Sequence, residues 1–217
     1  MNIEVTESLI ATDLCYIMNY YGSDKGSPED TVNHSYTRLY SNLFAPVKNE
    51  PVRVFELGLG TNNTDMVSNM GTSGKPGASL RGWRHFFPNG QIFGADIDRR
   101  ILFTDERINT FYCDQNVGET IREMWENPLL HEEFDIIIED GLHIFESNVN
   151  FFEHSYHKLK VGGVFVIEDI MYYNIDRFNA QIEEWKRKFP DLIYRLYTIP
   201  FKNNPYDNIV LIAQRVR

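Results

Sequence analysis

Seven short apolar runs, separated by helical stretches, occupy the chain from Val52 onward and restrict its fold more than any other feature. FDIIIEDG at 134–141 is an apolar run of the kind found in strands buried on both faces of a parallel sheet. Strands that alternate with helices predict an α/β fold, in which helices cover both faces of a mainly parallel sheet. The predicted strands cover residues 52–60, 91–98, 107–114, 134–141, 161–170, 192–199 and 208–215.

The segments between these strands predict helices and one reversal of strand direction. The stretch 175–189 is amphipathic and carries basic residues in its final turns, which is typical of a helix C-terminus. Only NNPYD at 203–207 and its flanks separate the last two strands, so we expect a hairpin and an antiparallel last strand. The other helices predicted in this part of the chain cover residues 79–87, 117–126 and 146–159.

The first 50 residues have a different pattern from the alternating segment that follows them. Residues 6–20 carry apolar side chains near helical spacing, and a short helix is expected at 34–44. Between these two helices, YGSDKGSP at 21–28 predicts a loop. We therefore expect a helical lead-in over residues 1–50, followed by one core domain over residues 51–217.

The 217 residues include 31 Asp and Glu against 21 Lys and Arg, which gives a formal net charge of −10. This charge argues against a protein that wraps nucleic acid or lies on an anionic membrane. No apolar run approaches the roughly 20 residues that span a bilayer, and the first ten residues contain acids where a signal peptide needs basic residues. Two cysteines exclude a disulfide framework and a Cys-rich zinc site. We expect a cytoplasmic enzyme or binding domain.

Glycines and polar residues follow the first three predicted strands, where parallel α/β sheets bind ligands. Glycines allow close approach of the backbone, and a carboxylate after the second strand can accept both ribose hydroxyls of a nucleoside. The pattern lacks a full G-x-G-x-x-G, and Asp96 lies 36 residues beyond Gly60 where about 20 are usual, because a Gly/Asn/Ser-rich segment at 61–78 intervenes. The alternative is a plain α/β turn in which Asp96 and Asp98 are a solvated pair without a ligand. The candidate nucleoside-binding residues are Glu56, Gly58, Gly60, Asp96, Asp114 and Gln115.

Acids and a histidine follow the fourth and fifth strands: Asp140 and His143 after one, Glu168 and Asp169 after the other. Neighbouring carboxylates repel one another unless a cation or proton lies among them, and oxygen ligands suit Mg²⁺ or a similar divalent ion. His143 would stand beside the metal and accept a proton from a substrate hydroxyl. Two alternatives stay open: one acid of each pair, Glu139–Asp140 and Glu168–Asp169, caps the following helix, or His143 is a loop histidine hydrogen-bonded to a neighbouring carboxylate.

Together these residues resemble those of class I S-adenosylmethionine-dependent methyltransferases. More narrowly, the chain resembles the metal-dependent sugar O-methyltransferases of macrolide biosynthesis, the rhamnosyl O-methyltransferases and the proteins called cephalosporin hydroxylases. The most specific match is EDGLHIFESNVNFFEHSYHKLKVGGVFVIEDI at 139–170. YGSDKG at 21–26, HSYTRLY at 34–40 and GASLRGWRHFFPNGQIFGADID at 77–98 are also similar. The resemblance covers most of the chain and implies a Rossmann-like, seven-stranded fold of class I methyltransferases.

The resemblance also implies a role for each candidate residue. In the cofactor site, the methionine part of S-adenosylmethionine would meet Glu56, Gly58 and Gly60, its carboxylate Ser79, its ribose Asp96, and its adenine Asp114 and Gln115. Mg²⁺ would be held by Asp140, Glu168 and Asp169. The catalytic residues would be Asp140 and His143, with His143 as the base. The weaker candidates for acceptor contacts, taken from the lead-in, are Tyr21, Asp24, Lys25, His34 and Tyr36, and Lys25 and Arg38 would offer donors to an anionic acceptor.

The sequence departs from this family at residues 61–78, since in much of the family the glycine loop passes almost directly into the helix. We expect Asn62, Asn63, Ser68 and Asn69 in this segment to shape an acceptor pocket or to cover the cofactor. A mobile surface loop is the alternative. The insertion also makes the match of Ser79 to the family less direct.

The resemblance implies an S-adenosylmethionine- and Mg²⁺-dependent O-methyltransferase that acts on a sugar or on a glycan or capsule precursor in polysaccharide biosynthesis. Other acceptors are a phosphate or phosphoramidate group and a small natural product. The rival classes are a Rossmann-like oxidoreductase or hydroxylase and a non-catalytic subunit that binds S-adenosylmethionine. We expect no nucleic-acid partner and no membrane span, and a homodimer is the default oligomeric state.

Overall fold

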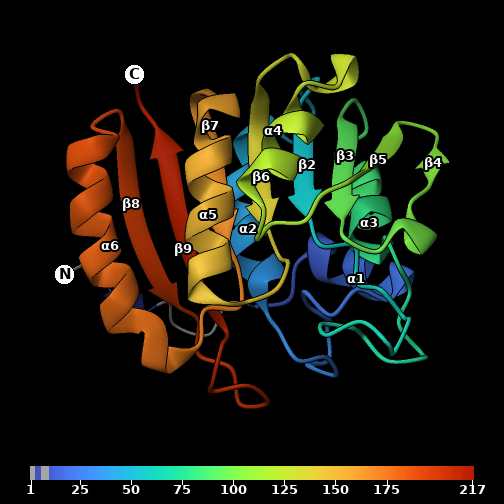
Figure 1. Ribbon diagram of the computed structural model, residues 1–217. Helices are drawn as coiled ribbons and strands as arrows, with labels where there is room; N and C mark the ends of the chain where they lie inside the picture. Colours follow the sequence, from blue (N-terminus) through green and yellow to red (C-terminus); the bar gives the residue numbers. More distant parts are fainter. Residues whose placement is uncertain (1–2, 6–9) are drawn as a thin grey trace.

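The computed structural model describes residues 3–5 and 10–217, and within them the strands form one nine-stranded mixed sheet (Figure 1). The strand order is β1-β8-β9-β7-β6-β2-β3-β5-β4. The strands are β1 (Ile3–Val5), β2 (Arg53–Leu57), β3 (Gln91–Asp96), β4 (Thr104–Asp105), β5 (Ile108–Tyr112), β6 (Phe134–Glu139), β7 (Leu159–Ile167), β8 (Leu192–Thr198) and β9 (Ile209–Arg215).

All seven predicted strands are present, and their directions match the prediction. β2, β3, β5, β6 and β7 pair in parallel, whereas β9 is antiparallel to both of its neighbours, β7 and β8. The sequence did not predict β1 and β4, which lie at the two edges of the sheet. These strands have three and two residues, too few for an alternating pattern to show.

Six helices among the described residues cover the two faces of the sheet, as the sequence predicts (Figure 1). Alternate strand residues face opposite sides: Ile137 packs with α4, α5 and α6, whereas Ile136 and Ile138 pack with α1, α2 and α3. Aromatic rings from the helices fill both layers. The helices are α1 (Asp13–Tyr21), α2 (Tyr36–Phe44), α3 (Ala78–Phe86), α4 (Gly118–Trp125), α5 (Phe145–Ser155) and α6 (Ile175–Lys188).

The lead-in helices α1 and α2 belong to the same hydrophobic layer as α3 of the core. The predicted helix at 6–20 begins in the structure only at Asp13, after the N-cap Thr12, and its positions 6–9 lie outside the described residues. The division of the chain at residue 50 stays a prediction. No helix among the described residues is long and apolar enough to cross a membrane.

The order of the strands positions the ligand site. β2 lies between β3 on one side and β6 on the other. The chain runs from β2 outward to β3 and β5, and then returns to the other side of β2 to form β6 and β7, so the strand order reverses between β2 and β6. Open α/β sheets bind their ligands at the carboxyl ends of the strands beside such a point. This is the lower edge of the sheet in Figure 1, towards which the arrowheads of β2 and β3 point.

Candidate active site

A cavity of about 420 Å³ lies at the carboxyl ends of β2, β3, β5 and β6. It gathers residues that the sequence predicts for three different purposes. Its cofactor candidates are Gly58, Gly60, Ser79, Asp96, Asp114 and Gln115, its metal and catalytic candidates are Asp140, His143 and Asp169, and its acceptor candidates are Asp24 and Lys25.

Gly58 allows the turn after β2 to pass directly beneath the end of β6. Its φ is +91°, in the left-handed region, and a Cβ atom there would lie 1.8 Å from the carbonyl oxygen of Asp140. Any side chain would therefore push the turn and Asp140 apart. The glycine is needed for both the conformation and the close approach, which supports the prediction of a tight ligand-binding turn.

Glu56 does not line the cavity, although it ends β2 beside the glycine turn. Its side chain is fully buried and accepts hydrogen bonds from Ser79 Oγ and Trp83 Nε1, both on α3. Burial raises the pKa of Glu56, and the Lys25 ammonium, 3.8 Å away, opposes that rise. Glu56 therefore fixes the start of α3 against the sheet, and the Ser79 hydroxyl is engaged with this carboxylate.

The two acids after β3 have different functions. Asp96 lines the cavity and accepts the backbone N–H groups of Leu59, at 2.7 Å, and Asp98, at 2.8 Å, which joins the β3 end to the glycine turn. Asp98 points away to the insertion, where its Oδ2 accepts Thr61 Oγ1 and Asn63 Nδ2, both at 2.7 Å. Of the two, only Asp96 lines the cavity, and both are buried, so the alternative of a solvated Asp pair does not describe these residues.

A buried polar chain supports the wall where Gln115 lies. Gln115 Nε2 donates to Glu139 Oε1 at 3.0 Å, and Gln115 Oε1 accepts the N–H of Leu142 at 2.8 Å. Burial raises the pKa of Glu139 to about 7, and its second oxygen has no hydrogen-bond partner among the described residues. Glu139 thus holds Gln115 and the turn after β6 and does not cap the following helix. Asp114 also lines the cavity and accepts the N–H of Asn116 at 3.0 Å.

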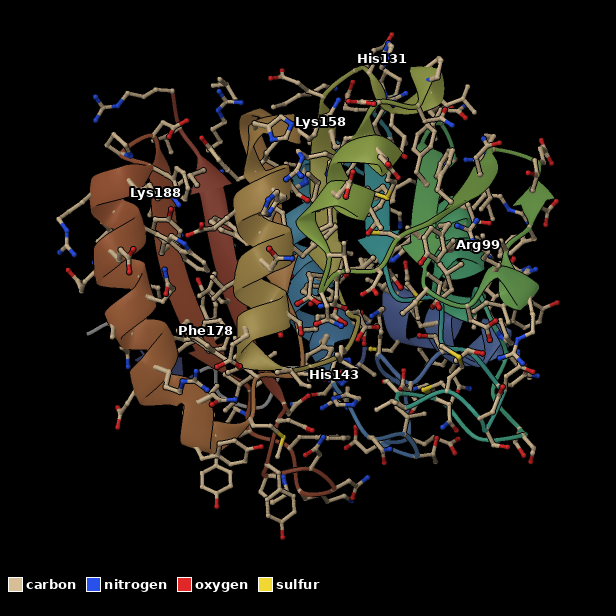
Figure 2. The ribbon with its side chains drawn as sticks, in the orientation of Figure 1. Arg99, His131, His143, Lys158, Phe178 and Lys188 are labelled. Carbon is tan, nitrogen blue, oxygen red and sulfur yellow. The ribbon has the colours of Figure 1, made fainter. Side chains whose placement is uncertain are left out.

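His143 joins the ends of β6 and β7 at the lower end of the sheet (Figure 2). Its Nε2 lies 3.1 Å from Asp140 Oδ1 and 3.1 Å from Asp169 Oδ2. Burial alone would lower the pKa of His143, but the carboxylates of Asp169 and Asp140 raise it to about 10. His143 and Asp169 also have positive φ values of 59° and 53°, an uncommon conformation for residues other than glycine that clusters at functional sites.

The predicted metal ligands occupy two levels of this site. Oxygens of Asp140 and Asp169 and a nitrogen of His143 all lie within 4.8 Å of one another, close enough to hold one metal ion. Glu168 lies deeper and is 1% exposed, where Tyr40 donates to its Oε1 at 2.6 Å and Lys25 to its Oε2. The structure therefore brings Asp140 and Asp169 together with His143, whereas Glu168 is outside this group, and the ammonium of Lys25 contacts both Glu168 and Asp140.

The lead-in supplies contacts to this cluster, although not all of those that the sequence predicts. His34 Nδ1 lies 3.3 Å from Asp169 Oδ1, and Tyr36 donates its hydroxyl to the same carboxylate. Tyr21 lies outside the cavity and packs edge-on against His85. Lys25 and Arg38, the expected donors to an anionic acceptor, already have protein partners, because Lys25 contacts buried carboxylates and Arg38 pairs with Asp30, and their contact with an acceptor stays a prediction.

The insertion at 61–78 covers one side of the cavity. Its residues 66–70 and 73–75, which include Ser68 and Asn69, line the cavity wall. Arg100 ties the insertion to β3 through two bonds of 3.0 Å to Asp65, and Met70 N–H donates to Thr61 O at 2.8 Å. The segment is thus part of the cavity wall through Ser68 and Asn69, whereas Asn62 and Asn63 do not line the cavity, and its contact with an acceptor or a cofactor stays a prediction.

Three residues of the site are not predicted by the sequence pattern. Tyr40 and Trp83 hold Glu168 and Glu56, and Glu139 holds Gln115. Tyr40 and Trp83 occupy apolar helix positions, where an aromatic residue is expected in the core. The one available signal was that Glu139 and Glu168 each precede an aspartate at a strand end.

The strand order, the glycine turn after β2 and the antiparallel β9 give the chain the fold of the class I S-adenosylmethionine-dependent methyltransferases. Its relatives within that class are sugar O-methyltransferases, which confirms the resemblance stated above. No family model matches the chain.

Two relatives and one solved structure show the extent of the similarity. The chain is 36% identical over 138 residues to the 8-demethyl-8-(2-methoxy-alpha-L-rhamnosyl)-tetracenomycin-C 3'-O-methyltransferase of Streptomyces olivaceus, covering 63% of this chain and 32% of that protein. It is 35% identical over 137 residues to the demethylmacrocin O-methyltransferase of Streptomyces fradiae, with the same coverage. The MycE methyltransferase from the mycinamycin biosynthetic pathway, in complex with Mg and SAH, superposes with a TM-score of 0.72 and 25% identity, covering 97% of this chain and 56% of that one. The chain spans about a third of the length of the curated relatives it matches.

Proposed function

We propose that the protein is an S-adenosylmethionine- and Mg²⁺-dependent O-methyltransferase that acts on a hydroxyl group of a sugar. The observation that carries the proposal is the position of His143, which lies between Asp140 and Asp169 on the wall of the cavity that Asp96 and Gln115 also line. A proton acceptor, a set of carboxylates and a nucleoside-type pocket thus share one cavity. The match to sugar O-methyltransferases covers only part of those proteins, so the activity is inferred from the site as well.

The cofactor candidates fit S-adenosylmethionine. The Gly58 turn offers close backbone approach, Asp96 offers a carboxylate for the ribose, and Gln115 and Asp114 lie on the wall where the adenine would bind. Glu56 acts from beneath the turn, since it holds α3 and Ser79 in place. S-adenosylmethionine supplies the methyl group, and the protein's contribution is to hold its sulfonium in line with the acceptor oxygen.

The donor set also fits a divalent cation. Asp140 and Asp169 present oxygens to one point, Glu168 shares the Lys25 ammonium with Asp140, and hard ions such as Mg²⁺ prefer carboxylate oxygens. These three residues would hold the ion, which when bound supplies Lewis-acid activation of the acceptor hydroxyl. His143 would accept the hydroxyl proton at Nε2. His143 must be neutral to accept this proton. A divalent cation held by Asp140 and Asp169 would offset the negative charge that raises the pKa of His143, and would therefore lower that pKa and favour the neutral imidazole.

Exposed aromatic residues near the catalytic edge favour a sugar acceptor over a phosphate. Tyr172 and Tyr173 closely follow Asp169, and these residues are 55% and 63% exposed. Tyr206, 61% exposed, places its ring 6.5 Å from that of Tyr172. Amphipathic tyrosine rings at a surface suit ligands that have both apolar faces and hydroxyls, as sugars do. We therefore favour a glycan precursor or a glycosylated small molecule as the acceptor.

Location and assembly are further parts of this proposal. A cytoplasmic enzyme is supported by the composition, in which two cysteines, both buried and unpaired, are the only ones in the chain. We propose a homodimer, the commonest assembly among soluble homo-oligomers.

The proposal is tested by incubating the protein with methyl-labelled S-adenosylmethionine and a panel of nucleotide sugars, glycosides and glycan fragments. We expect label to reach a sugar hydroxyl, EDTA to abolish the transfer and Mg²⁺ to restore it. Transfer that is indifferent to EDTA would remove the metal from the proposal. Transfer to phosphate esters alone would replace the sugar acceptor, and cofactor binding without transfer to any acceptor would favour a non-catalytic subunit.

A further inference from the structure

The ammonium group of Lys25 occupies the centre of the carboxylate cluster. Its Nζ lies 2.6 Å from Asp140 Oδ2, donates to Glu168 Oε2 and is 3.8 Å from Glu56 Oε1. The side chain is 2% exposed. Burial alone would lower the pKa of Lys25, but the three carboxylates raise it well above its usual value, so the group is a cation. A protein cation thus compensates acids that come from three separate strand ends.

The backbone of Lys25 is held independently of this contact. Its N–H donates to Ser23 Oγ at 3.3 Å, and its carbonyl accepts the N–H of Thr37 at 3.2 Å. Lys25 also lines the cavity. The four-carbon side chain can therefore leave the carboxylates by rotation about its own bonds and enter the cavity, while the backbone of the lead-in loop stays in place.

We propose that Lys25 is the resident counter-cation of the metal site and that a divalent cation displaces its ammonium from Asp140 and Glu168. The inference rests on the metal site in the proposed function. Mg²⁺ binds oxygen at about 2.0–2.1 Å. An ammonium group hydrogen-bonded to the same two carboxylates would then lie close to the ion, and the two positive charges would repel each other strongly. Glu168 keeps its bond to Tyr40 through Oε1, so Oε2 is the oxygen that changes partner.

This exchange has two consequences of opposite sign. Without metal, Lys25 stabilises the fold, because buried carboxylates that lose their partner are strongly destabilising. With metal, the same lysine weakens binding, because the ion must first displace it. The displaced ammonium then projects into the cavity beside Asp24 and brings a positive charge to the side of the pocket formed by the lead-in.

The first test titrates the wild-type protein and the Lys25→Met variant with Mn²⁺. Electron paramagnetic resonance measures the concentration of the free ion. We expect Lys25→Met to bind Mn²⁺ at least about fivefold more tightly, to melt at a lower temperature without metal and to recover when Mn²⁺ is added. Lys160→Met is the matched control, since it removes a lysine that pairs with Asp135 at 2.9 Å outside the cavity. Unchanged or weaker Mn²⁺ binding by Lys25→Met, or no binding by either protein, overturns the proposal.

The second test needs no variant and applies even if Lys25→Met fails to fold. Reductive methylation of the wild-type protein, read by peptide mass spectrometry, should modify Lys25 faster in Mg²⁺ than in EDTA, with Lys160 modified equally in both. Equal protection of Lys25 in the two conditions contradicts displacement. Neither test uses S-adenosylmethionine or an acceptor, so a failure here leaves the proposed methyl transfer standing. Conversely, displacement by Mn²⁺ in a protein that binds no S-adenosylmethionine would defeat only the proposed function.

Discussion

The Nε2 atom of His143 lies 3.1 Å from Asp169 Oδ2, which joins the turn after β6 to the end of β7. The two strands are parallel neighbours, so residues that follow them meet at one edge of the sheet. Both residues have left-handed backbone conformations. The contact therefore depends on two turns that each hold a residue in an unfavourable geometry, as is found where a side chain must be aimed at a reaction.

Replacing His143 should remove turnover without removing cofactor binding. We choose His143→Asn because asparagine tolerates the left-handed backbone at this position. Loss of a general base should lower the rate of methyl transfer by roughly 10²–10⁴-fold, while the dissociation constant for S-adenosylmethionine stays within about threefold. Single-turnover assays and calorimetry measure the two quantities. His131→Asn, at an exposed histidine, is the control, and near-normal turnover in His143→Asn would leave His143 a structural residue.

Gly58 and Gly162 form a matched pair for testing the turn after β2. Their φ values are +91° and +87°, but a Cβ at Gly58 meets the Asp140 carbonyl, whereas a Cβ at Gly162 meets nothing within 4 Å. Gly162→Ala should cost only the backbone strain, about 1–2 kcal/mol. Gly58→Ala should cost more in urea unfolding and should also weaken S-adenosylmethionine binding. Equal losses of stability in the two variants would show that the close approach has no energetic weight.

Asp98 is expected to anchor the insertion that covers the cavity. Asp98→Ala removes the acceptor of Thr61 and Asn63, and hydrogen bonds to a charged group contribute about 1.5–3 kcal/mol each. Limited proteolysis should then cut within residues 61–78, and S-adenosylmethionine should bind more weakly. Asp105→Ala, which removes a more exposed ion pair with Arg84, is the control. Unchanged proteolysis and affinity in Asp98→Ala would mean that the insertion is held by its other contacts.

Cys113 should be almost inert to alkylation in the native protein. Burial, with a smaller contribution from the charge on Asp114, raises the pKa of its thiol to about 12. At pH 8 about one molecule in 10⁴ then carries the reactive thiolate, and the rate should rise tenfold per pH unit until the thiol titrates. Iodoacetamide labelling followed by mass spectrometry measures this. Rapid labelling of Cys113 at pH 8 in the folded protein would contradict the buried position.

The fold was largely predictable from the sequence because its signals are local. Each apolar run became a strand, and the short NNPYD loop correctly indicated the antiparallel β9. β1 and β4 could not be predicted, because two or three residues carry no periodicity and their pairing depends on an edge that is formed by the rest of the sheet. The residues at the strand ends were found because a parallel sheet brings all its carboxyl ends to one edge.

The partners within the site could not be predicted in the same way. Lys25 reaches Asp140 and Glu168, which lie far away in the sequence, and only the packing of the lead-in on the sheet brings them together. A lysine in a Gly- and Ser-rich loop is expected to be solvated, which is why it was assigned to an acceptor. Glu56 shows the complementary limit: its place at the strand end was predicted correctly, but the direction of its side chain, towards Trp83, depends on where α3 packs.

The central claim, a site for S-adenosylmethionine, is tested most directly by isothermal titration calorimetry of the purified protein with S-adenosylmethionine and, separately, with NAD. We expect S-adenosylmethionine to bind with one site per chain, Asp96→Ala to weaken that binding strongly, and NAD to give no binding heat. Binding of NAD without binding of S-adenosylmethionine would contradict the account and would identify a Rossmann-like oxidoreductase site in its place.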